Sequence, residues 1–111
     1  MNKSLDNLLT PQERQAVDTL VQSLRQKYPD RIREVMLFGS KARGDSRPDS
    51  DIDLLILVDD DHWRFSHTIG KMAARVSLNR DVLLGPCVIS QTRWPSTILY
   101  RTVAGEGIPL A

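Results

Sequence analysis

The apolar run that begins at Ile52 constrains the fold of this chain more than any other segment. Between Ile52 and Val58 only Asp53 interrupts a series of isoleucine, leucine and valine residues. A strand with one face in water alternates polar and apolar residues, whereas a strand buried on both faces reads as a nearly continuous apolar run. We therefore expect residues 52–58 to form the central strand of the fold.

A helix and a first strand are predicted before this run. Thr10-Pro11-Gln12-Glu13 has the form of a capping box with proline at the first helical position. The apolar residues that follow at helical spacing are Val17, Leu20, Val21, Leu24 and Tyr28. A helix is thus predicted over residues 11–28. Pro29-Asp30 ends it, and residues 32–38 have the pattern of a short strand that leads into Gly39-Ser40.

Polar residues 41–50 predict a loop or a short helical turn before the central strand. After that strand, Asp59-Asp60-Asp61 is expected to cap a helix that runs to about Leu78. The residues that share its apolar face are Phe65, Ile69, Met72, Ala73 and Val76. A third strand should begin at Asp81, and Gly85-Pro86 within it predicts a bulge or a sheet edge because proline has no N–H to donate.

A last helix is predicted from about Pro95 to Ala104, with Gly105 or Gly107 as its C-terminal stop. Its inward residues would be Ile98, Leu99, Thr102 and Val103. Residues 108–110 are expected to be extended. The order αββαβα favours one α/β (α+β) domain over residues 1–111, a small mixed sheet flanked by helices.

Composition excludes several classes of protein. Apolar residues make up 41% and charged residues 26% of the chain, as in ordinary globular proteins. No apolar run approaches the roughly 18 residues of a membrane span. The start of the chain lacks a signal-peptide pattern and Cys87 has no second cysteine to pair with, so we expect a cytoplasmic location and no membrane. A net charge of +1 makes direct nucleic-acid binding a weak hypothesis.

Two carboxylates head the central strand. Asp51 and Asp53 are two residues apart, so their side chains project from the same face while Ile52 points into the core. Paired carboxylates bind hard cations such as Mg²⁺, which nucleotidyl transfer uses to stabilise the attacking and leaving oxygens. Gly39-Ser40 offers backbone N–H groups and a hydroxyl to phosphates. This pattern predicts a nucleoside triphosphate site.

Topology brings these residues together. If the first two strands are antiparallel, the loop between them places Gly39-Ser40 and the two acids at one end of the sheet. If the helix after Val58 is a crossover, the third strand is parallel to the second. Its first residue, Asp81, is then expected at the same end. Asp59-Asp60-Asp61 would lie roughly 25 Å away at the far end of the central strand.

Each of these signals also has a plainer interpretation. The two acids could form an acidic strand edge, although such acids are costly to bury unpaired. Asp81 could be a turn residue paired with Arg80, and Lys41 and Arg43 could be solvated charges. The histidines His62 and His67 have no partners at ligand spacing, which disfavours zinc. Trp63 and Trp94 could be core residues or a docking surface.

Gly39-Ser40, followed after ten residues by Asp51-Ile52-Asp53, resembles the G-S-x10-D-x-D signature of the minimal nucleotidyltransferase (MNT) family. This family lies within the DNA polymerase beta-like nucleotidyltransferase superfamily. The resemblance extends from Leu37 to Leu54. Asp81-Val82-Leu83 is similar to the family's third-acid strand, and residues 98–107 are similar to its usual C-terminal segment.

The resemblance implies a polymerase beta-like nucleotidyltransferase fold and a role for each motif residue. The implied metal-binding, catalytic acids are Asp51, Asp53 and Asp81, with Asp81 also the general base. The implied nucleotide-binding residues are Gly39, Ser40, Lys41, Arg43 and Ser50. Family members often have arginine at the position of Lys41, and lysine keeps the charge but loses bidentate phosphate geometry. The implied cofactor is Mg²⁺, with ATP as substrate.

Stand-alone members of the MNT family are typically antitoxins that adenylylate a HEPN-domain ribonuclease toxin encoded nearby. The resemblance therefore implies transfer of AMP from ATP to a hydroxyl, commonly of tyrosine, on such a toxin within a hetero-oligomer. A chain of this size leaves little room for an acceptor-binding lobe, which also favours a protein acceptor. Two alternatives stay open: a non-catalytic antitoxin that acts by complex formation, and a subunit of a small-molecule nucleotidyltransferase.

Overall fold

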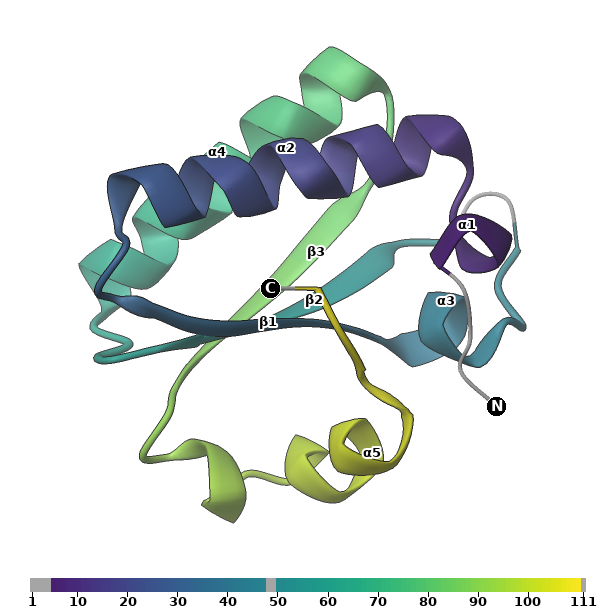
Figure 1. Cartoon of the computed structure of the whole chain (residues 1–111). Helices are drawn as coiled ribbons and strands as arrows, with labels where there is room; N and C mark the ends of the chain where they lie inside the picture. Colours follow the sequence, from purple (N-terminus) through teal and green to yellow (C-terminus); the bar gives the residue numbers. More distant parts are fainter. Residues whose placement is uncertain (1–4, 48–49, 111) are drawn as a thin grey trace.

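The apolar run forms strand β2 (Ile52–Val58) inside a four-stranded sheet with the order β3-β2-β1-β4. The computed structural model describes residues 5–47 and 50–110 (Figure 1). Strand β1 (Ile32–Phe38) pairs antiparallel with β2, and β3 (Leu84–Ser90) pairs parallel with it. The short β4 (Ile108–Pro109) lies antiparallel on the other side of β1. The predicted small mixed sheet is confirmed.

Helices cover both faces of the sheet, as the apolar run requires. Helices α2 (Pro11–Lys27) and α4 (Trp63–Arg80) lie on one face. The short 3₁₀ turn η1 (Trp94–Ser96) and helix α5 (Leu99–Glu106) lie on the other face (Figure 1). Two apolar clusters result, one on each side of β2. None of the helices in the described part of the chain is long and apolar enough to cross a membrane.

The alternation of side chains along β2 determines where its acids point. Ile52, Leu54 and Ile56 belong to the cluster under α2 and α4. Leu55 and Leu57 belong to the cluster under α5. Because successive side chains on a strand point to opposite faces, Asp51 and Asp53 continue the row of Leu55 and Leu57. The two acids therefore head β2 on the face that α5 covers.

The N-terminal helix follows its sequence signals closely. Thr10 is the N-cap of α2, and its hydroxyl accepts a hydrogen bond from the Glu13 N–H at 3.1 Å. The Glu13 carboxylate accepts one from the Thr10 N–H at 2.9 Å, which completes the predicted capping box. The predicted loop or helical turn after β1 is the short helix α3 (Gly39–Arg43), which ends at Gly44. A short helix, α1 (Leu5–Leu8), was not predicted.

Two element boundaries differ from the sequence predictions. The N-cap of α4 is His62, whose ring accepts a hydrogen bond from the Arg64 N–H. Of the three aspartates before it, Asp59 pairs with Arg31, Asp61 pairs with Arg93, and Asp60 accepts a hydrogen bond from the His62 N–H.

The last helix begins at Leu99 instead of Pro95, because an extended residue, Thr97, separates η1 from α5. As a result Val103 is buried, while Ile98, predicted to point inward, is 98% exposed. The edge position of β3 agrees with its Gly85-Pro86 pair, and its register with β2 is continuous without a bulge.

Candidate active site

The two acids at the start of β2 lie close to neighbouring backbone on both sides. Asp53 is opposite Phe38 of β1 and opposite Gly85 of β3, whereas Asp51 precedes the strand and is exposed. Partial burial raises the pKa of Asp53 above its ordinary value, and the nearby Asp51 carboxylate raises it further. The positive charge of Arg43 acts in the opposite direction. A carboxylate whose ionisation is disfavoured by burial and by a neighbouring acid is one that a bound cation would stabilise.

The predicted phosphate turn at Gly39-Ser40 closely approaches Asp53. Gly39 has φ +76°, a conformation that glycine adopts without the penalty that a side chain brings. A Cβ atom at this position would lie 2.2 Å from Oδ2 of Asp53. The backbone at Gly39 therefore approaches the carboxylate as closely as only a glycine allows. The structure thus shows the expected meeting of the Gly39-Ser40 turn with one of the two acids, Asp53.

Arg43, at the end of α3, is held by two carboxylates. Its Nε donates to Asp45 at 3.2 Å, and its Nη1 donates to Glu106 at 3.2 Å. These contacts raise the pKa of Arg43 further above its ordinary value, with the hydrogen bond to Asp45 the larger cause. Glu106 also accepts a hydrogen bond from the Gly39 N–H at 3.1 Å. Sequence reasoning placed Glu106 only within a family-like segment and gave it no function.

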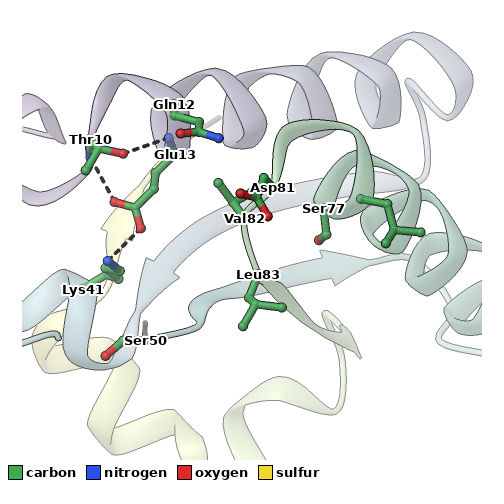
Figure 2. Close-up of a pocket in the computed structure, with 10 residues that line it drawn as sticks. Thr10, Gln12, Glu13, Lys41, Ser50, Ser77, Asp81, Val82 and Leu83 are labelled. Carbon is green, nitrogen blue, oxygen red and sulfur yellow. Dashed lines mark hydrogen bonds and ion pairs between the residues drawn. The ribbon is translucent and has the colours of Figure 1, made fainter. Parts of the chain in front are cut away.

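Lys41 has a different environment from the one predicted. Its Nζ lies 2.7 Å from Oε2 of Glu13, and both side chains are largely buried. Burial acts to raise the pKa of Glu13, but hydrogen bonds from Lys41 and Thr10 outweigh it and leave the pKa below its ordinary value. Lys41 thus points toward the start of α2 and ties it to α3 (Figure 2). The prediction that Lys41 contacts a triphosphate does not agree with this geometry.

A cavity of about 550 Å³ lies between the start of α2, the end of α4 and the residues before β2 (Figure 2). Ser50, the residue before Asp51, lines it together with Lys41 and Glu13. Its apolar lining includes Leu78 and Leu83, which are 85% and 58% exposed. The Ser50 hydroxyl also accepts a hydrogen bond from the Arg47 N–H at 2.8 Å. The cavity thus adjoins the acid pair at Ser50.

The expectation that Asp81 is the first residue of the third strand is wrong, although that strand is parallel to β2 as expected and Asp81 precedes it at the same end of the sheet as Asp51. Asp81 is the C-cap of α4, with φ 54°, and β3 begins only at Leu84. The β3 residue next to Asp53 is Gly85. Among residues 5–47 and 50–110, no three histidine, cysteine, aspartate or glutamate side chains are grouped to hold a metal. Asp81 instead lines the cavity, on its α4 side (Figure 2).

Comparison with known protein families identifies the domain. The family model described as "Nucleotidyltransferase domain" matches residues 17–98, which include the phosphate turn, both acids of β2 and Asp81. The chain belongs to the nucleotidyltransferase domain family. A nucleotidyltransferase relative from Methanocaldococcus jannaschii, provisionally named protein adenylyltransferase MJ0604, is 36% identical over 98 residues. That match covers 86% of this chain and 94% of the relative.

Solved structures share the nucleotidyltransferase fold described above. A toxin–antitoxin complex described as MntA-HpeT mutant Y104A has a TM-score of 0.63 and 24% identity, over 86% of this chain and 71% of that one. A toxin–antitoxin with AMP-PNP has a TM-score of 0.60 and 20% identity, over 85% and 72%. A structure described as a minimal nucleotidyltransferase has a TM-score of 0.60 and 23% identity, over 98% of both chains.

Proposed function

We propose that this nucleotidyltransferase transfers AMP from ATP to a hydroxyl group of a partner protein, a HEPN-type toxin, and thereby acts as an antitoxin. The observation that carries the proposal is the close approach of Gly39 to Asp53, because it would join a backbone that binds phosphate to a pair of acids that bind a metal. The acceptor is proposed to be a tyrosine. The provisional name of the relative, protein adenylyltransferase, supports a protein acceptor.

Asp51 and Asp53 fit Mg²⁺. They present carboxylate oxygens on one face, and a bound cation would relieve the repulsion that helps raise the pKa of Asp53. The metal would supply charge stabilisation for the α-phosphate and for the departing pyrophosphate. The backbone at Gly39, the Ser40 hydroxyl and the Arg43 guanidinium are proposed to bind and orient the triphosphate.

In the transfer step, the acceptor oxygen forms a bond to the α-phosphorus while the bond from that phosphorus to the bridging oxygen breaks. Pyrophosphate leaves with the electron pair, and the acceptor hydroxyl loses its proton. Asp81 is proposed to take this proton from an acceptor that enters through the cavity, which both Ser50 and Asp81 line. In this arrangement Asp81 acts on the acceptor and does not bind the metal.

The partner assignment draws on the solved structures of the same fold. Two of them are toxin–antitoxin complexes, and one of these contains AMP-PNP. Transfer requires the partner to bring its hydroxyl to the open end of the sheet near Asp51. The exposed leucines Leu78 and Leu83 at the cavity offer an apolar surface for that contact.

The test combines the purified protein, its genomic neighbour, Mg²⁺ and ATP labelled at the α-phosphate. Label should appear on the neighbour with wild-type protein and be lost with Asp53→Asn. The matched control is Asp59→Asn, the same change at the opposite end of β2, which should keep the label. Absence of label from α-labelled ATP with wild-type protein would refute the transfer, and label from γ-labelled ATP would show phosphoryl transfer instead, because the γ-phosphate leaves with pyrophosphate.

The non-catalytic alternative predicts a different result in cells. An Asp51→Ala/Asp53→Ala variant that still binds the neighbour and neutralises its toxicity would show that complex formation is sufficient. If the variant binds but no longer protects, transfer is required. Co-purification of the variant with its neighbour must accompany the growth assay, so that lost binding is not mistaken for lost catalysis.

A further inference from the structure

Glu106 is the carboxylate nearest to the phosphate turn that the proposed mechanism leaves unused. It is the last residue of α5, and its side chain is 17% exposed. It accepts hydrogen bonds from the Gly39 N–H at 3.1 Å and from Arg43 Nη1 at 3.2 Å. One side chain from the end of the chain thus contacts both ends of α3.

The direction of the Gly39 N–H places Glu106 behind the turn. In a strand that lies between two others, every second residue directs its backbone N–H and C=O to the same neighbouring strand. The Val35 carbonyl accepts from the Leu110 N–H, so the N–H of Gly39, four residues later, also faces the β4 side. Asp53 lies on the other side, on β2. Glu106 therefore contacts the turn from the β4 side, whereas Asp53 contacts it from the β2 side.

Arg43 connects this support to the acids. Its positive charge favours the ionised form of Asp53 and partly offsets the rise in the Asp53 pKa that burial and Asp51 cause. Its described contacts with Asp45 and Glu106 use Nε and Nη1 of a group that has five N–H donors. The two carboxylates fix the plane of the guanidinium, and a fixed plane is what bidentate phosphate binding requires.

The end of α5 holds Glu106 in place through tight packing. A Cβ atom at Gly107 would lie 2.6 Å from the Val103 carbonyl oxygen and 3.3 Å from the sulfur of Met36. The Gly107 N–H donates to that same carbonyl and closes the helix. The backbone beside Glu106 is thus packed directly on β1, the strand that leads into the phosphate turn.

From these contacts we propose that Glu106 is a positioning residue for nucleotide binding: it holds Arg43 and the Gly39 backbone in the arrangement that receives the triphosphate. This inference rests on the proposed nucleotide-transfer function. Glu106 does not touch the reacting atoms in this arrangement. Its loss should weaken binding of Mg·ATP more than it slows transfer at saturating ATP.

The test measures binding of Mg²⁺ with a fluorescent ATP analogue, together with KM and kcat for label transfer. Glu106→Gln keeps an acceptor for the Gly39 N–H but loses the charge that holds Arg43. Binding should weaken about fivefold, as expected for a partly exposed ion pair, with kcat changed less than twofold. The matched control is Asp18→Asn, an equal charge change at an exposed ion pair with Arg14 on α2, which should change binding less than twofold.

A double-mutant cycle separates positioning from general stabilisation. In an Arg43→Gln background, Glu106→Gln should have little further effect on binding, whereas a purely structural role would give additive losses and a matching fall in Tm. Tighter binding by Glu106→Gln would overturn the proposal, because it would show that the carboxylate only repels phosphate. Unchanged binding by Glu106→Gln would also overturn the positioning role of Glu106, but it would not contradict the proposed AMP transfer. A wild-type protein that binds no Mg·ATP would refute both the positioning role and the AMP transfer.

Discussion

Replacing Gly39 with alanine should separate the geometry of the active site from the stability of the fold. The new methyl group would lie 2.2 Å from Oδ2 of Asp53, so the two must move apart by about 1 Å to reach an ordinary contact of 3.4 Å. A shift of this size at a metal-binding oxygen exceeds the roughly 0.2 Å tolerance of metal–ligand distances. Misplacement by about 1 Å can lower a rate about 100-fold.

The stability cost of Gly39→Ala should be much smaller than its catalytic cost. Left-handed backbone at a non-glycine residue costs about 1–2 kcal/mol, and the collision adds to this only as far as Asp53 cannot move. We therefore expect a loss of about 1–2 kcal/mol in the free energy of unfolding, measured by urea denaturation, and about 100-fold slower label transfer.

Gly44→Ala provides a matched control for backbone strain. Gly44 has φ +82°, but among residues 5–47 and 50–110 a Cβ atom there would meet only the Leu8 side chain, at an ordinary 3.5 Å. This variant should lose a similar free energy of unfolding and keep transfer within about threefold of wild type. In an Asp53→Ala background, where the two nearest atoms are gone, Gly39→Ala should cost less stability than it does alone. Gly39→Ala with transfer as fast as Gly44→Ala would refute the inferred contact.

Three further outcomes follow from the described contacts. Lys41→Met should lower the free energy of unfolding by about 2–3 kcal/mol in urea denaturation, because it leaves the buried Glu13 carboxylate without its ion-pair partner. Adding Glu13→Gln to this variant should restore part of the loss. Because folding lowers the pKa of Glu13, the ionised carboxylate stabilises the fold above the unfolded-state pKa. This stabilisation is lost as the pH falls through the folded-state pKa. Urea denaturation across the acidic range should therefore show a loss of stability that Glu13→Gln reduces. Asp81→Asn should slow label transfer while Mg·ATP binding stays within twofold of wild type, and weakened metal binding would contradict its placement outside the metal site.

Local sequence signals predicted most of the framework. The capping box fixes the start of α2, and the apolar run identifies the strand that both layers of helices cover. From the sequence, the meeting of the Gly39 turn with Asp53 depended on antiparallel pairing of β1 with β2, and that pairing is present in the structure. These parts were predictable because each depends on residues close together in the sequence.

Other parts depend on contacts between distant segments. Lys41 and Arg43 are both basic residues in one short helix, yet one faces Glu13 and the other faces Glu106. The direction in which each side chain of a five-residue helix points depends on the elements that pack against the helix. The spacing of residues in the sequence does not reveal those elements. Asp81 was misplaced because two residues, Val82 and Leu83, separate it from β3, so it ends a helix instead of beginning a strand.

The pairing of β4 with β1 has a consequence for the dynamics of the protein. Residues of β4 lie opposite Met36 and Leu37, so this contact closes a loop of most of the chain length, and β4 itself is two residues long. A strand pairing that closes a long loop with few hydrogen bonds is among the first parts of a structure to open locally. Amide protons at Leu110 and Gly39 should therefore exchange with solvent together and faster than those of β2. Each such opening would release Arg43 from Glu106, which links the fraying of the C-terminal segment to the fraction of molecules ready to bind nucleotide.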